Sequence, residues 1–193
     1  MTSKSIETIK GLYYYPDFLT TDEEREIIKY LEESTLWENP VMGFGPLKRK
    51  VIQYGYSYPY TRRGKLEATT PIPTELDLTD KFNVKSLESF RPEQLIVNCY
   101  LSKERIAPHV DHTELFGETI ACVTLNRAAT MVFSRGSQKI EVPVARRSIY
   151  VMTGDARYEW KHSMKPETNI RPRYSLTYRT KRLVARLNIG GQS

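Results

Sequence analysis

Apolar residues follow two different periods along this chain, and the first is helical. In the segment TTDEEREIIKYLEES, three apolar residues recur at the spacing of one helix face: Ile27, Ile28 and Leu31. Thr20 or Thr21 can cap this segment, because a glutamate follows three residues later, as in a capping box. The pattern predicts an amphipathic helix over about residues 21–34.

From residue 93 onward the pattern changes to short runs rich in Val, Ile, Tyr and Thr. Glycine, asparagine, aspartate and proline separate these runs, which are EQLIVNCYL, ETIACVTL, ATMVFSR, QKIEVPVA, RSIYVMT, DARYEWKH and RYSLTYRT. Many short strands at near-regular spacing are typical of a sandwich or jelly roll. We therefore predict an all-β core with flanking helices.

A run of tyrosines between these two regions repeats with the period of a β-strand. In VIQYGYSYPYTRRG, alternate residues predicted to share one face of a strand or hairpin arm are Tyr54, Tyr56, Tyr58 and Tyr60. Such a stripe is typical either of half-buried sheet packing or of a surface that stacks bases. Segment 66–82 contains two prolines and is predicted to be a loop, followed by a second helix that reaches about Phe90.

The composition is that of a globular protein without a membrane segment. Of its 193 residues, 39% are hydrophobic and 27% charged, and this length suits one domain with a buried core. No apolar run approaches the roughly 18 residues that a membrane span requires, and the N-terminal residues contain no signal-like apolar region. Cys99 and Cys122 lie in apolar runs and form no CxxC pair. We expect an intracellular monomer, in the cytoplasm or the nucleus.

The chain is basic, with a net charge of +6. The basic residues cluster at 48–50, 62–65, 146–147 and 171–186. An excess of this size is typical either of a solvated surface or of a protein that binds an anionic partner such as nucleic acid.

Two of the three histidines flank one aspartate in IAPHVDHTELF. On a strand, His109 and Asp111 would point to the same side and His112 to the other. The remaining histidine is His162. Two histidines and one carboxylate with open positions form the ligand set of non-heme Fe(II) oxygenases. These three residues are therefore candidate metal ligands, although the spacing HxD also occurs in surface loops and caps.

Two of the predicted strands have one polar face. Alternation assigns to these faces Asn98 and Tyr100 in the first strand, and Arg173, Ser175, Thr177 and Arg179 in the last. Two arginines on one face of a β-core are costly to bury unless anions meet them, and a guanidinium can pair both oxygens of a carboxylate. The arginine face is therefore either an edge in water or a dry site for a carboxylate ligand.

Taken together, these motifs resemble the AlkB family of Fe(II)- and 2-oxoglutarate-dependent dioxygenases. The stretch RRSIYVMTGDARYEWKHSM is similar to members related to the branch that works on the wobble uridine of transfer RNA. The resemblance covers about residues 11–182 and is densest after residue 93. It implies a double-stranded β-helix, or jelly roll, with N-terminal helices.

The resemblance also implies a single domain over residues 1–193. Within it, residues 1–92 would hold the N-terminal helices and a substrate lid, residues 93–182 the β-helix catalytic core, and residues 183–193 a tail. His109, Asp111 and His162 would bind Fe(II) at the catalytic centre. There the enzyme would oxidise a substrate C–H bond while 2-oxoglutarate becomes succinate, and an oxidised N-methyl group would leave as formaldehyde.

The same resemblance implies how the cosubstrate 2-oxoglutarate binds. Arg173 would hold its distal carboxylate with help from the Tyr100 hydroxyl, and Asn98 would add a side-chain hydrogen bond. Arg179 would lie close to the metal-bound end. Ser175 stands where many relatives carry asparagine, and its side chain is shorter.

Relatives of this kind act on alkylated bases held outside the stack, and residues 40–75 occupy the place of their substrate lid. The substrate-binding residues that we predict are Lys48, Arg49 and Lys50 for phosphates, and Tyr54, Tyr56 and Trp160 for the base. Trp160 shares a strand face with His162 in this prediction, and its alternative place is the core.

The function that we favour is oxidative demethylation of alkylated bases in single-stranded or flipped-base DNA or RNA. Thr113 stands where DNA-repair relatives carry a carboxylate that reads the damaged base, so other substrates stay open. One alternative is the same chemistry on a protein side chain, or as hydroxylation of a transfer-RNA wobble modification. Another is a non-catalytic nucleic-acid-binding module on the same fold.

Overall fold

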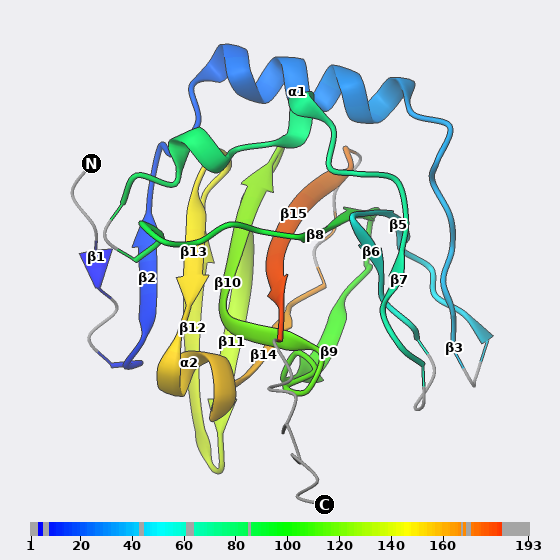
Figure 1. Cartoon of the computed structure of the whole chain (residues 1–193). Helices are drawn as coiled ribbons and strands as arrows, with labels where there is room; N and C mark the ends of the chain where they lie inside the picture. The colour runs from blue at the N-terminus through cyan, green and yellow to red at the C-terminus, as the bar shows by residue number, and fades with distance from the viewer. Residues whose placement is uncertain are drawn as a thin grey trace, which may run out of the picture.

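The computed structural model describes residues 4–5, 8–42, 45–60, 64–84, 86–166, 168 and 171–182. The predicted tail, 183–193, and the basic residues Arg62 and Arg63 lie outside the described residues. At the centre of the molecule are two β-sheets, and each described strand pair within them is antiparallel (Figure 1).

The larger sheet contains, in spatial order, β1 (Lys4–Ser5), β2 (Leu12–Tyr15), β13 (Ile149–Met152), β10 (Phe116–Leu125), β15 (Arg173–Lys181), β8 (Gln94–Tyr100) and β5 (Lys50–Tyr54). The smaller sheet contains β12 (Gln138–Val144), β11 (Ala129–Arg135), β14 (Lys161–Met164) and β9 (Ile106–His109). Two short hairpins are formed by β3 (Val41–Met42) with β4 (Gly45–Pro46), and by β6 (Tyr56–Ser57) with β7 (Glu67–Ala68). The predicted all-β core is confirmed.

Apolar side chains from both sheets form one core cluster between them. Ile120 and Tyr150 come from the larger sheet, and Met131 and Phe133 come from the smaller one. Alternation along the strands produces this layer, because every second residue of a strand faces the same side. The two sheets therefore enclose a space whose walls are set by the inward-facing residues of each strand.

Helix α1 (Thr21–Glu33) covers the outer face of the larger sheet (Figure 1). Thr20 and Glu23 form the predicted capping box, so the helix begins where the sequence indicates. Ile27 and Leu31 are buried in a second core cluster, together with outward-facing residues of the sheet such as Leu176 of β15. The predicted helix is thus confirmed, and it packs against the sheet through its apolar stripe.

The second helix, predicted to follow the loop 66–82 and to reach about Phe90, is not formed in the described residues. Two short 3-10 helices, Thr74–Leu76 and Thr79–Lys81, lie instead within the segment predicted to be a loop. Between them the Asp77 carboxylate accepts hydrogen bonds from the backbone N–H and the hydroxyl of Thr79. Such local bonds compete with helical ones, so the segment folds as a compact loop over the outer core.

The run DARYEWKH, predicted to be one strand, is divided between two elements. Its first half forms the short helix α2 (Gly154–Tyr158), and its end begins β14. Gly154 has φ +47°, in the left-handed region, and this turns the chain out of β13. Trp160 closes the helix by donating its backbone N–H to Asp155.

The tyrosine stripe does not share one strand face, because Gly55 interrupts it. Gly55 has φ +75°, so β5 ends at Tyr54 and β6 begins one residue after the break. Tyr54 is buried in the outer core cluster with Leu31 of α1. Tyr58 and Tyr60 lie on the other side of the sheet, where they line a cavity. None of the described helices is long and apolar enough to cross a membrane.

Candidate active site

The three candidate metal ligands lie together at one end of the space between the sheets. His109 is the last residue of β9, and it lies directly opposite His162 of β14 in the strand register. Asp111 follows two residues later, in the loop just beyond the end of β9. One ligand atom of each residue lies within 4.8 Å of the others. The arrangement provides the two nitrogens and one carboxylate oxygen that suit Fe(II).

Both histidines offer a ring nitrogen to a metal ion. The Nδ1 of His109 lies 2.8 Å from the Ala107 carbonyl oxygen and can donate to it, and its Nε2 faces Asp111 Oδ1 at 3.4 Å. Burial and the neighbouring His109 lower the pKa of His162 to about 3. A neutral imidazole is the form that binds metals, so burial favours at His162 the protonation state that a metal ligand requires.

Asp111 is held as a buried carboxylate. Burial alone would raise its pKa, but the charge of Arg179 and the hydrogen bond with His109 outweigh burial and keep the pKa well below its usual range. The Nε of Arg179 donates to Asp111 Oδ2 over 3.1 Å, and Arg179 also donates to Gln94 over 3.0 Å. Asp111 Oδ1 lies 3.4 Å from the Nε2 of His109. One carboxylate oxygen thus faces the histidines while the other is occupied by Arg179.

A cavity of about 590 Å³ extends from these residues between the two sheets. The polar residues of its lining include Tyr100, Asp111, His162, Arg173, Ser175 and Arg179. The polar face predicted for β15 therefore faces the interior. The alternative of an edge in water does not apply, because Arg173 and Arg179 are both buried.

Arg173 lies deep in this cavity and has hydrogen-bonding capacity left over. Its side chain donates to the Thr124 hydroxyl over 3.1 Å and to the Met164 sulfur over 3.2 Å, and its guanidinium lies 5.4 Å from the centre of the Tyr100 ring. Its Nε has no hydrogen-bond partner among the described residues, although the side chain is 2% exposed. A buried cation of this kind requires an anion, and the carboxylate of 2-oxoglutarate fits that requirement.

Asn98 and Ser175 are cross-strand partners between β8 and β15. The Asn98 amide donates to the Ser175 hydroxyl over 3.4 Å, so the shorter serine still reaches its neighbour. Arg173 and Tyr100 form the next inward-facing pair of the same two strands. These four of the five predicted cosubstrate residues are therefore brought together on one wall.

The predicted substrate residues do not all lie at the cavity. Arg49 lines the cavity and donates from Nε to the Asn98 side-chain oxygen over 3.0 Å. Lys48 and Lys50 alternate with it and are exposed outside the cavity. Tyr56 lies beside β15, where its hydroxyl accepts a hydrogen bond from Lys181.

Two of the predicted substrate residues, Tyr54 and Trp160, lie away from the cavity. Tyr54 lies under α1 on the opposite face of the sheet, because the turn at Gly55 separates it from the later tyrosines. Trp160 is 2% exposed and belongs to the core cluster between the sheets, with Arg135 4.9 Å from its ring centre. Residue 160 precedes β14, so the strand rule that paired it with His162 does not apply there. Neither side chain lines the cavity.

The sequence reasoning missed Gln94. This residue holds Arg179, and it shares the inward face of β8 with Asn98 and Tyr100, so strand alternation could have found it. Tyr58 and Tyr60, which belong to the predicted tyrosine stripe, line the cavity, and their ring centres lie 5.2 Å apart. Their position depends on the turn at Gly55, and the period-two pattern alone does not reveal it.

Comparisons with known proteins agree with this geometry. Residues 11–189 match the family model described as the 2OG-Fe(II) oxygenase superfamily. The chain is 29% identical over 163 residues to the tRNA (carboxymethyluridine(34)-5-O)-methyltransferase alkbh8 of Xenopus tropicalis. That alignment covers 81% of this chain and 25% of the relative, so the chain spans about a quarter of that protein's length.

A second relative and a solved structure extend the likeness. The chain is 29% identical over 182 residues to the alkylated DNA repair protein ALKBH8 homolog of Arabidopsis thaliana, covering 80% of this chain and 50% of that one. The solved structure of OsALKBH1 has a TM-score of 0.72 at 14% identity, covering 93% of this chain and 100% of that chain. This structural likeness confirms the predicted double-stranded β-helix. The chain belongs to the 2OG-Fe(II) oxygenase superfamily, a family that uses Fe(II) and 2-oxoglutarate.

Proposed function

We propose that this protein oxidatively demethylates alkylated bases in single-stranded or flipped-base nucleic acid, releasing formaldehyde and succinate. The observation that carries the proposal is a single cavity that contains three metal-binding side chains and the buried guanidinium of Arg173, whose Nε has no partner among the described residues. When bound, Fe(II) and 2-oxoglutarate would supply the oxidising power for a substrate C–H bond. The protein's own residues would bind, orient and enclose the reactants.

In this proposal His109, Asp111 and His162 hold the iron. Asp111 supplies the negative charge of the ligand set, and Arg179 keeps its second oxygen occupied, which favours binding through one oxygen. His109 is oriented by the Ala107 carbonyl. Both of these ligands thus have a partner that fixes their direction before a metal ion arrives.

The cosubstrate would lie along the wall formed by β8 and β15. Arg173 would bind the distal carboxylate of 2-oxoglutarate through the fork that it presents to the cavity, with the Tyr100 hydroxyl beside it. Asn98 and Ser175 would contact its middle, and Arg179 would approach the end nearest the metal. The cavity wall offers no carboxylate near Arg173 among the described residues, so an incoming diacid meets attraction there.

A nucleic-acid base is favoured as the substrate by the aromatic and cationic groups at the same cavity. Tyr58 lies 5.2 Å from Tyr60 and 5.8 Å from Phe116, measured between ring centres, which offers flat surfaces for stacking. Arg49 and Arg105 line the cavity as well, and the net charge is +6. Stacking on aromatic side chains contributes about 1–3 kcal/mol per base and tolerates different sequences.

The proposal is tested by product analysis with the full chain. The protein is incubated with Fe(II), ascorbate and 2-oxoglutarate, together with methylated single-stranded DNA, methylated RNA or methylated histone peptides. We expect formaldehyde and succinate in equal amounts with at least one nucleic acid, and neither product above background with Asp111→Ala. Formaldehyde from the peptides alone would refute the nucleic-acid substrate and favour a protein side chain.

A second candidate is hydroxylation of a transfer-RNA wobble modification. It is favoured by Thr113, which stands where DNA-repair relatives carry a base-reading carboxylate. The name of the Xenopus relative, a methyltransferase for carboxymethyluridine 34 of transfer RNA, supports the substrate of this candidate but not its reaction. In that case mass spectrometry of digested transfer RNA would show a nucleoside heavier by one oxygen, and succinate would form without formaldehyde. Absence of succinate with every substrate would instead favour a binding module without turnover.

A further inference from the structure

We propose that Arg157 is a positioning residue for the metal centre, which it orients by holding the backbone of the loop that carries Asp111. This inference rests on the metal site of the proposed function and extends it to a side chain that contacts the backbone around the ligands and not their ligating atoms. Arg157 lies on α2 and is 2% exposed, which makes it one of the largest fully buried side chains.

The contacts of Arg157 are directed to one short stretch of backbone. Its Nη1 donates to the Asp111 carbonyl over 2.9 Å, its Nη2 to the His112 carbonyl over 3.4 Å, and its Nε to the Gly117 carbonyl over 3.3 Å. These three carbonyls belong to the loop after β9 and to the start of β10. A planar guanidinium that donates in three directions fixes the path of the chain around Asp111.

The other hydrogen bonds of this loop hold its second half: the Phe116 N–H donates to the His112 carbonyl over 3.1 Å, and the Arg182 N–H donates to the Leu115 carbonyl over 2.9 Å. Asp111 lies beyond the last residue of β9, and β10 begins only at Phe116, so strand pairing does not hold residues 110–115. Arg182 donates to the Thr113 carbonyl over 2.9 Å from outside. Arg157 is the buried counterpart of that contact, and it is the one that reaches the metal ligand's own peptide group.

Backbone hydrogen bonds to residues 10 and 11 hold the helix α2, which carries Arg157. The Ala156 N–H of α2 donates to the Lys10 carbonyl, and the N–H of Thr153, just before the helix, donates to the Gly11 carbonyl. Gly11 has φ +85°, and a Cβ there would meet the Thr153 oxygen at 2.1 Å, so the two segments approach as closely as backbone allows. A helix of five residues is thereby fixed firmly enough to position a side chain.

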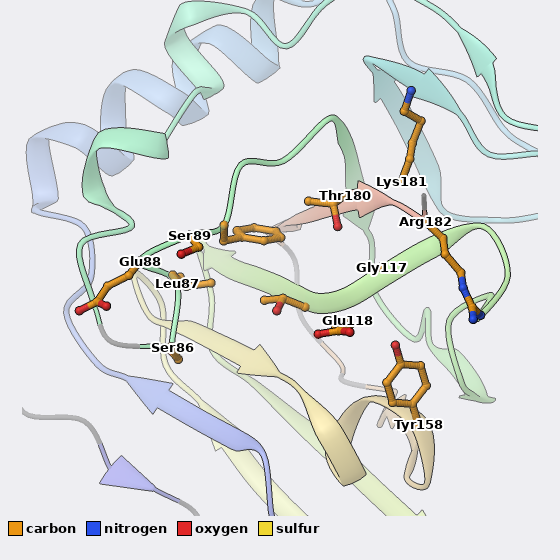
Figure 2. Close-up of a pocket in the computed structure, with 12 residues that line it drawn as sticks. Ser86, Leu87, Glu88, Ser89, Gly117, Glu118, Tyr158, Thr180, Lys181 and Arg182 are labelled. Atoms are coloured by element: carbon orange, nitrogen blue, oxygen red, sulfur yellow. The ribbon is translucent and has the colours of Figure 1, made fainter. Parts of the chain in front are cut away.

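A surface pocket of about 630 Å³ borders the same region. Figure 2 shows Gly117 of β10, Tyr158 of α2 and Arg182 around it, and Arg157 lies 4.9 Å from the Tyr158 ring centre. Arg157 therefore connects the wall of this pocket to the metal loop. A purely structural role for Arg157 would affect stability, whereas a positioning role also affects how the site binds a metal ion.

Cobalt binding distinguishes the two roles without any turnover. The full chain and its Arg157→Met and Arg157→Lys variants are titrated with Co(II), and both the dissociation constant and the visible absorption bands are measured. Loss of a group that orients a metal ligand typically costs about 10- to 100-fold in metal affinity. We expect that loss for Arg157→Met with altered bands, and partial recovery for Arg157→Lys.

The matched control is Arg146→Met. Arg146 pairs with the buried carboxylate of Glu24, a residue of α1 that does not belong to the metal loop, so this variant removes an arginine without touching that loop. It should lower stability while Co(II) affinity stays within about twofold.

Equal Co(II) affinity and bands for wild type and Arg157→Met would overturn the positioning role. If Arg157→Met does not fold, Arg157→Lys decides: unchanged bands and affinity overturn the role, and weaker binding with altered bands supports it. Equal Co(II) affinity of the wild type and the Asp111→Ala variant would overturn the proposed metal centre itself.

Discussion

Asp111 is the residue from which the proposed metal centre takes its negative charge. It is buried, Arg179 and the histidines surround it, and their charges and hydrogen bonds keep its pKa well below its usual range. The carboxylate is therefore ionised in the absence of metal, and its partners compensate the cost of burial. Asp111 is therefore already charged and oriented before a metal ion binds.

Replacing Asp111 by alanine should abolish turnover. A direct ligand matters at least as much as an outer partner, so we expect succinate formation to fall by at least about 100-fold. Asp111→Asn is the matched variant, because it keeps an oxygen for Arg179 and removes only the charge. Activity of Asp111→Ala within about tenfold of wild type would contradict its role as a ligand.

Replacing Arg173 by alanine should weaken cosubstrate binding and leave metal binding largely intact. Truncating one partner of a buried, hydrogen-bonded charge pair costs about 2–5 kcal/mol, which is at least about 30-fold in Kd. Calorimetry with Mn(II) and 2-oxoglutarate measures this without turnover, and Arg173→Lys serves as the charge-conserving control. An unchanged Kd for 2-oxoglutarate would remove Arg173 from the site.

At the scale of elements, patterns set by adjacent residues were predictable and those set by distant contacts were not. The capping box of α1 and the alternation of β8 and β15 are local, and alternation predicts that Asn98 and Ser175 both lie on inward faces, whereas the register that places them opposite each other depends on the pairing of the two strands. The strand β2 was not predicted, because its place beside β13 depends on residues more than a hundred positions away. Convergence of His109 and His162 followed from the family resemblance, since neither spacing nor period fixes the register of β9 against β14.

The break in the tyrosine run gives the clearest test at this scale. Gly55 has φ +75°, and a Cβ there would meet the Glu93 carbonyl oxygen at 1.9 Å. Gly55→Ala should therefore destabilise the fold by at least about 1–3 kcal/mol, and each kcal/mol lowers Tm by about 2–4 °C at this chain length.

Gly136→Ala is the control for that experiment. Gly136 also has a positive φ, +58°, but a Cβ there would lie in open space, with no atom beyond its chain neighbours within 4 Å. Its substitution carries the backbone cost without the clash, so the difference in Tm between the two variants isolates the contact with Glu93. Equal melting temperatures would show that the close approach of Gly55 does not matter for stability.

At the scale of the whole molecule, a group of positively charged side chains lies next to the cavity. Leu47 and Arg49 line the cavity, and Lys48 and Lys50 alternate with them toward solvent. Asn39 donates from its amide to the carbonyls of Leu47 and Lys48, over 3.0 Å in both cases, which holds this segment in place. The backbone that carries the exposed lysines is thus held beside the cavity, where phosphates on either side of a bound base would pass.

Replacing Lys48 and Lys50 together by alanine should weaken binding of single-stranded nucleic acid and flatten its salt dependence. Each phosphate contact contributes about 0.7 to the slope of log K against log salt concentration, so loss of two contacts should reduce the slope by about 1.4. Lys139→Ala with Lys161→Ala removes the same charge from exposed positions on the smaller sheet, and this control should leave the slope nearly unchanged. If both double variants change the slope equally, the net charge of the molecule attracts nucleic acid and the two lysines beside the cavity make no specific phosphate contacts.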